Sequence, residues 1–166
     1  MLTFRKATEH DLPRIMEICD GARRFMRSAG NLMQWVNGYP SELVILRDIE
    51  AGNSYVGIND SGVIEVTFAF ILGDDPTYKE ISGGAWLNDN PYGTIHRMAS
   101  AGLRSGMLDR VTRFCLTLTD NIRLDTHLDN KPMLRAASRL GYRRCGVIIC
   151  QDGTPREAFH LINKKI

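Results

Sequence analysis

The segment from residue 94 to residue 118 constrains the fold more than any other part of the chain. An expected strand at residues 94–99 precedes a glycine-containing loop at 102–106, and apolar residues at helical spacing follow from Met107 to Leu118. A strand, a glycine loop and a helix in this order direct backbone N–H groups and the positive helix end toward one point. A phosphate can bind at such a point. The alternative is an ordinary strand-to-helix turn, which glycines also commonly fill.

The rest of the chain alternates between strand and helix patterns. Polar capping residues stand before the other expected helices, which begin after residues 8–11, after Ser41 and after Asp129 or Asn130. Asp60-Ser61-Gly62 predicts a hairpin turn between two strands. Expected strands cover residues 2–6, 54–59, 63–72, 122–125, 142–150 and 156–162. The fold class that follows is α/β.

Composition favours one globular domain over residues 1–166, because 43% of the residues are hydrophobic and 24% are charged. The net charge is +2 and the basic residues are scattered, which argues against a dedicated nucleic-acid binder. The chain has neither a signal-like start nor an apolar run of membrane-spanning length, so we expect a cytoplasmic protein that does not bind membranes. The four cysteines form no C-x-x-C pair and the four histidines no H-x-x-x-H pair, so we expect reduced thiols and no metal.

The order of elements resembles the GNAT family, the GCN5-related N-acetyltransferases, over nearly the whole chain. Residues 95–99 look like the family's central strand, and residues 125–133 followed by Leu140-Gly141-Tyr142 look like its second cofactor motif. The resemblance implies a central mixed, mostly antiparallel sheet flanked by helices. It also implies acetyl-CoA as co-substrate, with pantetheine held by unpaired strand backbone as an added strand would be.

The resemblance assigns the cofactor contacts by position. The main chain of Met98 and Ser100 is expected to face pantetheine, and Asn130 and Met133 to meet the cofactor arm. The pyrophosphate is expected to lie against residues 103–108, which are Leu103, Arg104, Ser105, Gly106, Met107 and Leu108.

Three positions depart from the family pattern. The family's loop reads [QR]-x-x-G-x-[GA], and aligning Gly106 with its first glycine puts Leu103 at the Gln/Arg position and Leu108 at the final small position. Arg104 would offset the change at Leu103 with its charge. The family often has a tyrosine in the last helix to protonate the thiolate, but Ala137 stands there, so either water supplies that proton or the chain has lost activity.

The candidate catalytic residues are His96 and Tyr92. The family's general base often projects from the central strand, where Tyr92, Thr94 and His96 share one face if the strand is regular. His96 fits best, because an imidazole ordinarily titrates near neutral pH. A histidine that is hydrogen-bonded within the core is the alternative.

Trp35 and Tyr39 lie on a loop that in this family commonly lines the acceptor side of the cleft, so they are candidate substrate-binding residues, with burial in the core as the alternative.

We therefore expect an acetyl-CoA-dependent N-acyltransferase that transfers acetyl to a primary amine of a small molecule or peptide by direct attack. A non-catalytic CoA- or ligand-sensing module on the same fold is the other reading. The sequence leaves open the identity of the acceptor, the acyl-chain preference and the oligomeric state, for which a homodimer is one possibility.

Overall fold

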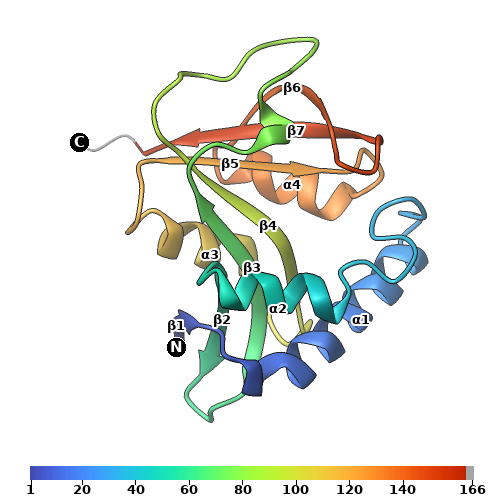
Figure 1. The fold of residues 1–166 in the computed structure, drawn as a ribbon, viewed down its shortest axis with the longest axis vertical. Helices are drawn as coiled ribbons and strands as arrows, with labels where there is room; N and C mark the ends of the chain where they lie inside the picture. Colours follow the sequence, from blue (N-terminus) through green and yellow to red (C-terminus); the bar gives the residue numbers. More distant parts are fainter. Residues whose placement is uncertain (164–166) are drawn as a thin grey trace. The chain divides into compact units, whose positions relative to one another are not determined.

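The computed structural model describes residues 1–163, in which strands and helices alternate along the chain (Figure 1). The strands are β1 (Leu2–Lys6), β2 (Ser54–Asn59), β3 (Ile64–Leu72), β4 (Gly93–Ser100), β5 (Asn121–Thr126), β6 (Arg143–Ile149) and β7 (Pro155–Ile162). The α-helices are α1 (Leu12–Ser28), α2 (Glu42–Glu50), α3 (Met107–Cys115) and α4 (Lys131–Arg139). Two short 3-10 helices are η1 (Glu9–Asp11) and η2 (Pro76–Tyr78).

The strands form one seven-stranded sheet within the described residues, in the order β1-β2-β3-β4-β5-β7-β6. β4 and β5 run parallel, whereas β1 with β2, β2 with β3, β5 with β7 and β6 with β7 are antiparallel. The expected α/β fold with a mixed, mostly antiparallel sheet is confirmed. The chain divides into two compact units, the first comprising Met1–Phe70 and His96–Met107, the second Ile71–Ile95 and the chain from Leu108 onward.

Two expected helix caps and one expected turn residue are confirmed. Ser41 Oγ accepts a hydrogen bond from the Val44 N–H at 3.4 Å, and Asn130 Oδ1 accepts one from the Met133 N–H at 3.4 Å. Each bond satisfies a donor that the first helical turn leaves unpaired. Gly62 has a φ of 80° in the β2–β3 turn, where a residue with a side chain would be strained.

The expected helix from Met107 to Leu118 is too long. α3 ends at Cys115, and the backbone N–H groups of Thr117 and Leu118 then bond to carbonyls three residues back. Leu118 is 44% exposed, so it does not continue the buried stripe of α3. The apolar periodicity alone does not reveal this end, because a tightened last turn keeps nearly the same spacing.

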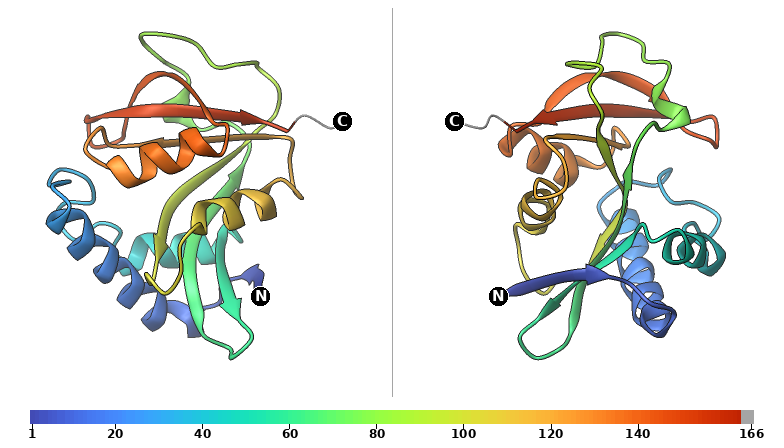
Figure 2. Two further views of the ribbon diagram at one scale, coloured as in Figure 1. Left: turned by 180° about the vertical axis from the view of Figure 1, so that it is seen from behind. Right: turned by 60° about the vertical axis from the view of Figure 1, so that its left-hand side comes forward.

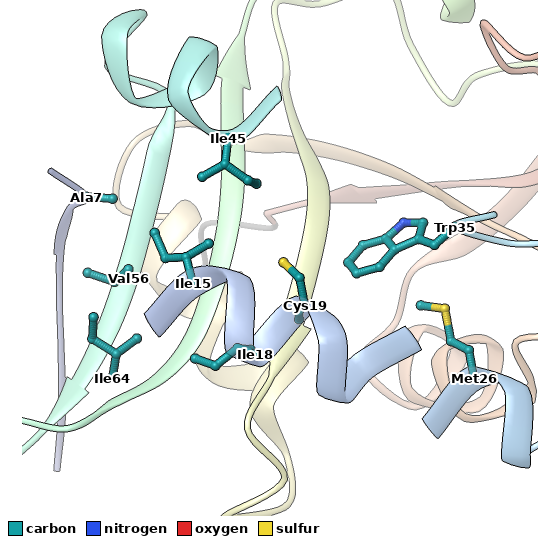
Figure 3. Packing of buried hydrophobic residues seen from close by; sticks show 10 residues of the cluster. Ala7, Ile15, Ile18, Cys19, Met26, Trp35, Ile45, Val56 and Ile64 are labelled. Atoms are coloured by element: carbon teal, nitrogen blue, oxygen red, sulfur yellow. The ribbon is translucent and has the colours of Figure 1, made fainter. Parts of the chain in front are cut away.

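The first unit has its own hydrophobic core. Residues of α1, including Ile15, Ile18 and Cys19, pack with Ile45 of α2 and Val56 of β2 (Figure 3). All five are at most 3% exposed. This packing covers one side of the β1–β2–β3 strands and fixes α1 and α2 in the unit.

In the second unit, aromatic side chains enclose the guanidinium of Arg123. Its carbon lies 4.2 Å from the Trp86 ring centroid and 3.8 Å from that of Tyr92. The Tyr78 ring lies tilted against Trp86, with centroids 4.9 Å apart, and its hydroxyl donates a hydrogen bond to Asp125 at 2.6 Å. These contacts hold the long segment between β3 and β4 on the side of the β5–β7–β6 strands opposite α4 (Figure 2). Buried rings therefore order this segment.

His160 is fully buried in the same unit. Its Nδ1 accepts a hydrogen bond from the Leu87 N–H at 3.3 Å, and its Nε2 lies 3.2 Å from Asn121 Oδ1. Because a backbone N–H can only donate, Nδ1 carries no proton and Nε2–H donates to Asn121. Burial, and then the positive charge of Arg123, lower the pKa of His160 to about 4.

We expect the free energy of unfolding to decrease as the pH falls from the unfolded-state pKa of histidine, about 6.5, toward about 4. In that window the unfolded state binds a proton at His160 that the folded state does not. The loss should reach about 2 kcal/mol by about pH 5. Urea unfolding of the wild type, His160→Gln and the exposed-site control His10→Gln checks this. Only His160→Gln should flatten the pH dependence; three parallel curves would mean that His160 titrates normally when folded.

Candidate functional site

β4 contains an irregular backbone at Arg97. This residue has a φ of 51°, in the left-handed region that residues other than glycine rarely adopt. Such a residue is typical of bulged strands and changes the direction in which the following side chains point. The parallel pairing with β5 covers Gly93–Ile95, opposite Ile122–Leu124. The regular alternation that the sequence suggested across residues 94–99 therefore ends at Arg97.

His96 lies immediately before Arg97 and is half-buried. Thr94 is 1% exposed, and its hydroxyl has no hydrogen-bond partner among the described residues. Tyr92 is 6% exposed, and its hydroxyl accepts a hydrogen bond from the Asp75 N–H at 2.8 Å. The boundary between the two units falls after Ile95, so His96 belongs to the first unit and Tyr92 to the second.

The loop after β4 has an open backbone. Gly102 and Gly106 have φ values of 74° and 70°, and a Cβ added to either would meet no atom within 4 Å. Ser100 Oγ accepts a hydrogen bond from the Gly102 N–H at 3.2 Å, and Ser105 is exposed. Leu103 is 61% exposed, so its side chain is not packed over the loop. An accessible backbone with glycine at its bends fits the approach of a phosphate group.

Arg104 is held by a carboxylate within the first unit. Its Nε and Nη2 both donate to Glu65 of β3, the latter at 2.7 Å, and Glu65 is 2% exposed. The Ala101 N–H also donates to the Glu65 carbonyl at 2.8 Å. Arg104 was expected to supply charge to the phosphate. Its guanidinium instead anchors the loop to β3, a contact across 39 residues that no local pattern reveals.

The remaining expected cofactor residues lie on three elements. Met98 and Ser100 of β4 are half-buried, and Met107 and Leu108 at the start of α3 are 6% and 5% exposed. At the start of α4, Asn130 and Met133 are half-buried and joined by the capping hydrogen bond.

The two aromatic residues of the segment between α1 and α2 differ in exposure. Trp35 is 8% exposed and belongs to the core cluster with Cys19 and Met26 (Figure 3), whereas Tyr39 is 38% exposed. The edge of one ring faces the other, with centroids 6.3 Å apart. Trp35 therefore lies inside the first unit, and Tyr39 is the member of the pair that solvent reaches.

Tyr142 and Cys150 of the second unit are poor proton donors. Tyr142 shares a 2.9 Å hydrogen bond with Thr112, and burial raises the pKa of its phenol. Burial, together with the negative charge of Asp125, raises the pKa of the Cys150 thiol to about 12. Ala137, at the position of the family's tyrosine, is fully buried in α4. The Tyr142 phenol and the Cys150 thiol therefore hold their protons more tightly than an ordinary phenol or thiol.

Residues 1–163 contain neither a membrane-spanning helix nor a metal-binding cluster. No helix in that range combines the length and the apolar character needed to cross a bilayer. The same residues contain no cluster of three or more His, Cys, Asp or Glu side chains arranged to hold a metal ion.

Several solved structures resemble this chain. An acetyltransferase of the GNAT family from Streptococcus agalactiae 2603 is 33% identical, with a TM-score of 0.88 over 99% of this chain and 96% of that one. Another GNAT-family acetyltransferase, from Listeria monocytogenes 4b F2365, is 18% identical, with a TM-score of 0.71 over 97% and 94%. Spermidine N-acetyltransferase from Vibrio cholerae, solved with CoA and spermine, is 12% identical, with a TM-score of 0.64 over 98% and 95%. No protein-family model and no curated protein matches.

Proposed function

The chain belongs to the GNAT family of acetyltransferases, and we propose that it transfers the acetyl group of acetyl-CoA to a primary amine. The observation that carries this proposal is the 33% identical acetyltransferase, which matches the chain over 99% of its length. The irregular β4 followed by an open glycine loop supports it, since both are features that acetyl-CoA binding in this fold would use. A single acyltransferase domain acting in the cytoplasm is part of the same proposal.

The chain would hold acetyl-CoA mainly through backbone groups. Met98 and Ser100 of β4 would bond to pantetheine as an adjacent strand would. The N–H groups of residues 103–108 would bind the pyrophosphate, with Arg104 shaping the loop through Glu65. Asn130 and Met133 would contact the pantetheine arm from α4. When bound, acetyl-CoA supplies a thioester whose carbonyl carbon accepts a nucleophile.

In the proposed reaction the amine nitrogen attacks that carbonyl carbon, a C–N bond forms and the C–S bond breaks. His96 accepts the proton that the amine loses, as a general base. Tyr92 is the second candidate, and its hydroxyl accepts a hydrogen bond from the Asp75 N–H. Water protonates the departing thiolate, because Tyr142 and Cys150 hold their protons tightly. A thiol with an ordinary pKa of about 8.5 needs little help to leave near neutral pH.

The acceptor would be a small molecule or a peptide that carries a primary amine. Tyr39 would face it, with Trp35 supporting the tyrosine ring from the core. The spermine bound by the Vibrio cholerae enzyme makes polyamines a first class to test. The departures from the family pattern at Leu108 and Ala137 favour a second candidate function, a CoA- or ligand-sensing module that binds its ligand without turnover.

The test is acetyl transfer with a panel of amines: spermine, spermidine, free amino acids and a peptide with an N-terminal alanine. We expect acetyl-CoA and at least one of these amines to yield free CoA thiol and acetylated amine in equal amounts. ATP and NAD in place of acetyl-CoA serve as controls and should yield no product. A protein that binds CoA in calorimetry yet releases no thiol with any of these amines would instead be a sensor.

A further inference from the structure

Arg97 joins three separated parts of the first unit. Its Nε and Nη2 donate to the two carboxylate oxygens of Asp48 at 2.7 Å each, and its Nη1 donates to Tyr39 Oη at 3.1 Å. Arg97 lies in β4, Asp48 in α2, and Tyr39 in the segment of residues 29–41 between α1 and α2. We call these three residues the Arg97 clamp.

The ion pair of the clamp is unlike a surface pair. Its side chains are only 14% and 13% exposed, and both carboxylate oxygens are engaged, which fixes the orientation of both groups. By contrast, Arg14 and Glu17 lie three residues apart on α1 with side chains 38% and 68% exposed. Such exposed pairs contribute little to structure. The Arg97 pair spans 49 residues and therefore constrains tertiary structure.

The segment 29–41 is otherwise bonded to α1 by arginines. Arg27 donates to the carbonyls of Asn31 and Trp35 at 2.7 and 2.8 Å, and Arg23 donates to the Tyr39 carbonyl at 3.0 Å. These bonds shape the segment and fix it to α1. The bond from Arg97 Nη1 to Tyr39 Oη is a side-chain hydrogen bond that links this segment to β4.

We propose that Arg97 is a positioning residue, which sets the place of Tyr39 and of segment 29–41 relative to β4 and so determines how the acceptor amine is bound. The inference rests on the proposed function, because it takes β4 to hold acetyl-CoA and Tyr39 to face the acceptor. The irregular backbone at Arg97 and the clamp act at the same residue. Arg97 interrupts the strand proposed to bind the cofactor, and its side chain also fixes the position of Tyr39 on the acceptor side of the site.

A positioning role predicts different effects on the acceptor's kcat/KM and on the affinity for acetyl-CoA. Loss of the clamp moves the acceptor side but removes no contact to acetyl-CoA, so the acceptor's kcat/KM should decrease while acetyl-CoA binding stays constant. Misplacement of a reactant by about 1 Å can cost about 100-fold in rate. A residue that merely stabilised the fold would lower the amount of active enzyme and leave both KM values unchanged.

The experiment compares Asp48→Asn, which removes the carboxylate charge, with Arg97→Gly, which removes the side chain at a φ that glycine adopts without strain. Glu17→Gln, which breaks the exposed pair on α1, is the matched control. With spermine, or with the panel amine that is acetylated fastest, both clamp variants should lose about 10- to 100-fold in kcat/KM for the amine. Their CoA affinity in calorimetry should match that of the wild type, and Glu17→Gln should be unchanged. Tyr39→Phe loses only the Nη1 bond and should show a smaller decrease.

Hydrogen exchange gives a readout that needs no acceptor. In Asp48→Asn, amides of residues 29–41 should exchange faster, while those of α1 keep their wild-type rates. Faster exchange with unchanged kcat/KM for the amine would overturn the positioning role, as would an equal loss of acetyl-CoA affinity. A wild-type protein that acetylates no amine would instead contradict the proposed function. This outcome is distinguishable from failure of the positioning role, because it is seen without any variant.

Discussion

Replacing His96 with glutamine is expected to lower kcat/KM for acetyl transfer by about 10²–10⁴-fold, the usual cost of losing a general base. His96 is half-buried in β4 next to the irregular Arg97, in the strand that the proposed function assigns to acetyl-CoA. Glutamine has a similar polar reach but cannot accept a proton at neutral pH. The affinity for CoA should change little, because the cofactor is held by backbone groups elsewhere.

The pH dependence sharpens this prediction. A base must be deprotonated to act, so kcat/KM of the wild type should rise with pH through a transition that His96→Gln lacks. The acceptor amine also titrates, so both proteins must be compared on the same amine, with the exposed-site variant His10→Gln as control. If His96→Gln kept the full rate and the same transition, the proton would leave through water or Tyr92, and His96 would be structural.

Gly106→Val should weaken CoA binding by about 10- to 100-fold, the cost of losing one charge-assisted hydrogen bond. Gly106 has a φ of 70°, directly before α3, and the space around its Cα is open. A branched side chain there would occupy the side from which a phosphate approaches. Calorimetric titration with CoA measures the affinity.

Gly62→Val is the matched control for this change. Gly62 has a φ of 80° in the β2–β3 turn, and a Cβ added there also meets no atom within 4 Å. Both variants therefore impose a similar strain on the backbone, about 1–2 kcal/mol for a side chain in the left-handed region. Only Gly106→Val should lose CoA affinity. Equal affinity in the two folded variants would place the pyrophosphate away from the loop.

Local chemistry made much of the fold predictable. Ser41 and Asn130 cap their helices because their short polar side chains accept hydrogen bonds from N–H groups that the first helical turn leaves unpaired. Gly62 forms the turn because glycine adopts a positive φ without strain. The end of α3 was missed, because apolar spacing continues past Cys115 into a tightened turn. The burial of Tyr78, Trp86 and Arg123 together was missed as well, because it depends on a segment without a periodic pattern.

The site was less predictable than the fold, because its contacts join residues far apart in the chain. Arg104 was placed at the phosphate from its position in the loop, but its partner Glu65 lies 39 residues away. The role of Arg97 has no signal in the sequence, since nothing in its neighbours indicates a left-handed backbone or the pair with Asp48. The resemblance supplied the candidate base and cofactor residues, and these assignments stay predictions.

The most direct measurement is a single-turnover reaction in which excess protein is mixed with isotopically labelled acetyl-CoA and spermine, and then with each other amine of the panel. We expect the label to leave CoA and appear on the amine nitrogen, with one free thiol for each acetylated amine. The transfer should depend on the amine, since direct attack requires it. Label that stays on CoA with every amine, while CoA binds in calorimetry, would contradict acetyl transfer and leave the chain a member of the family that senses CoA.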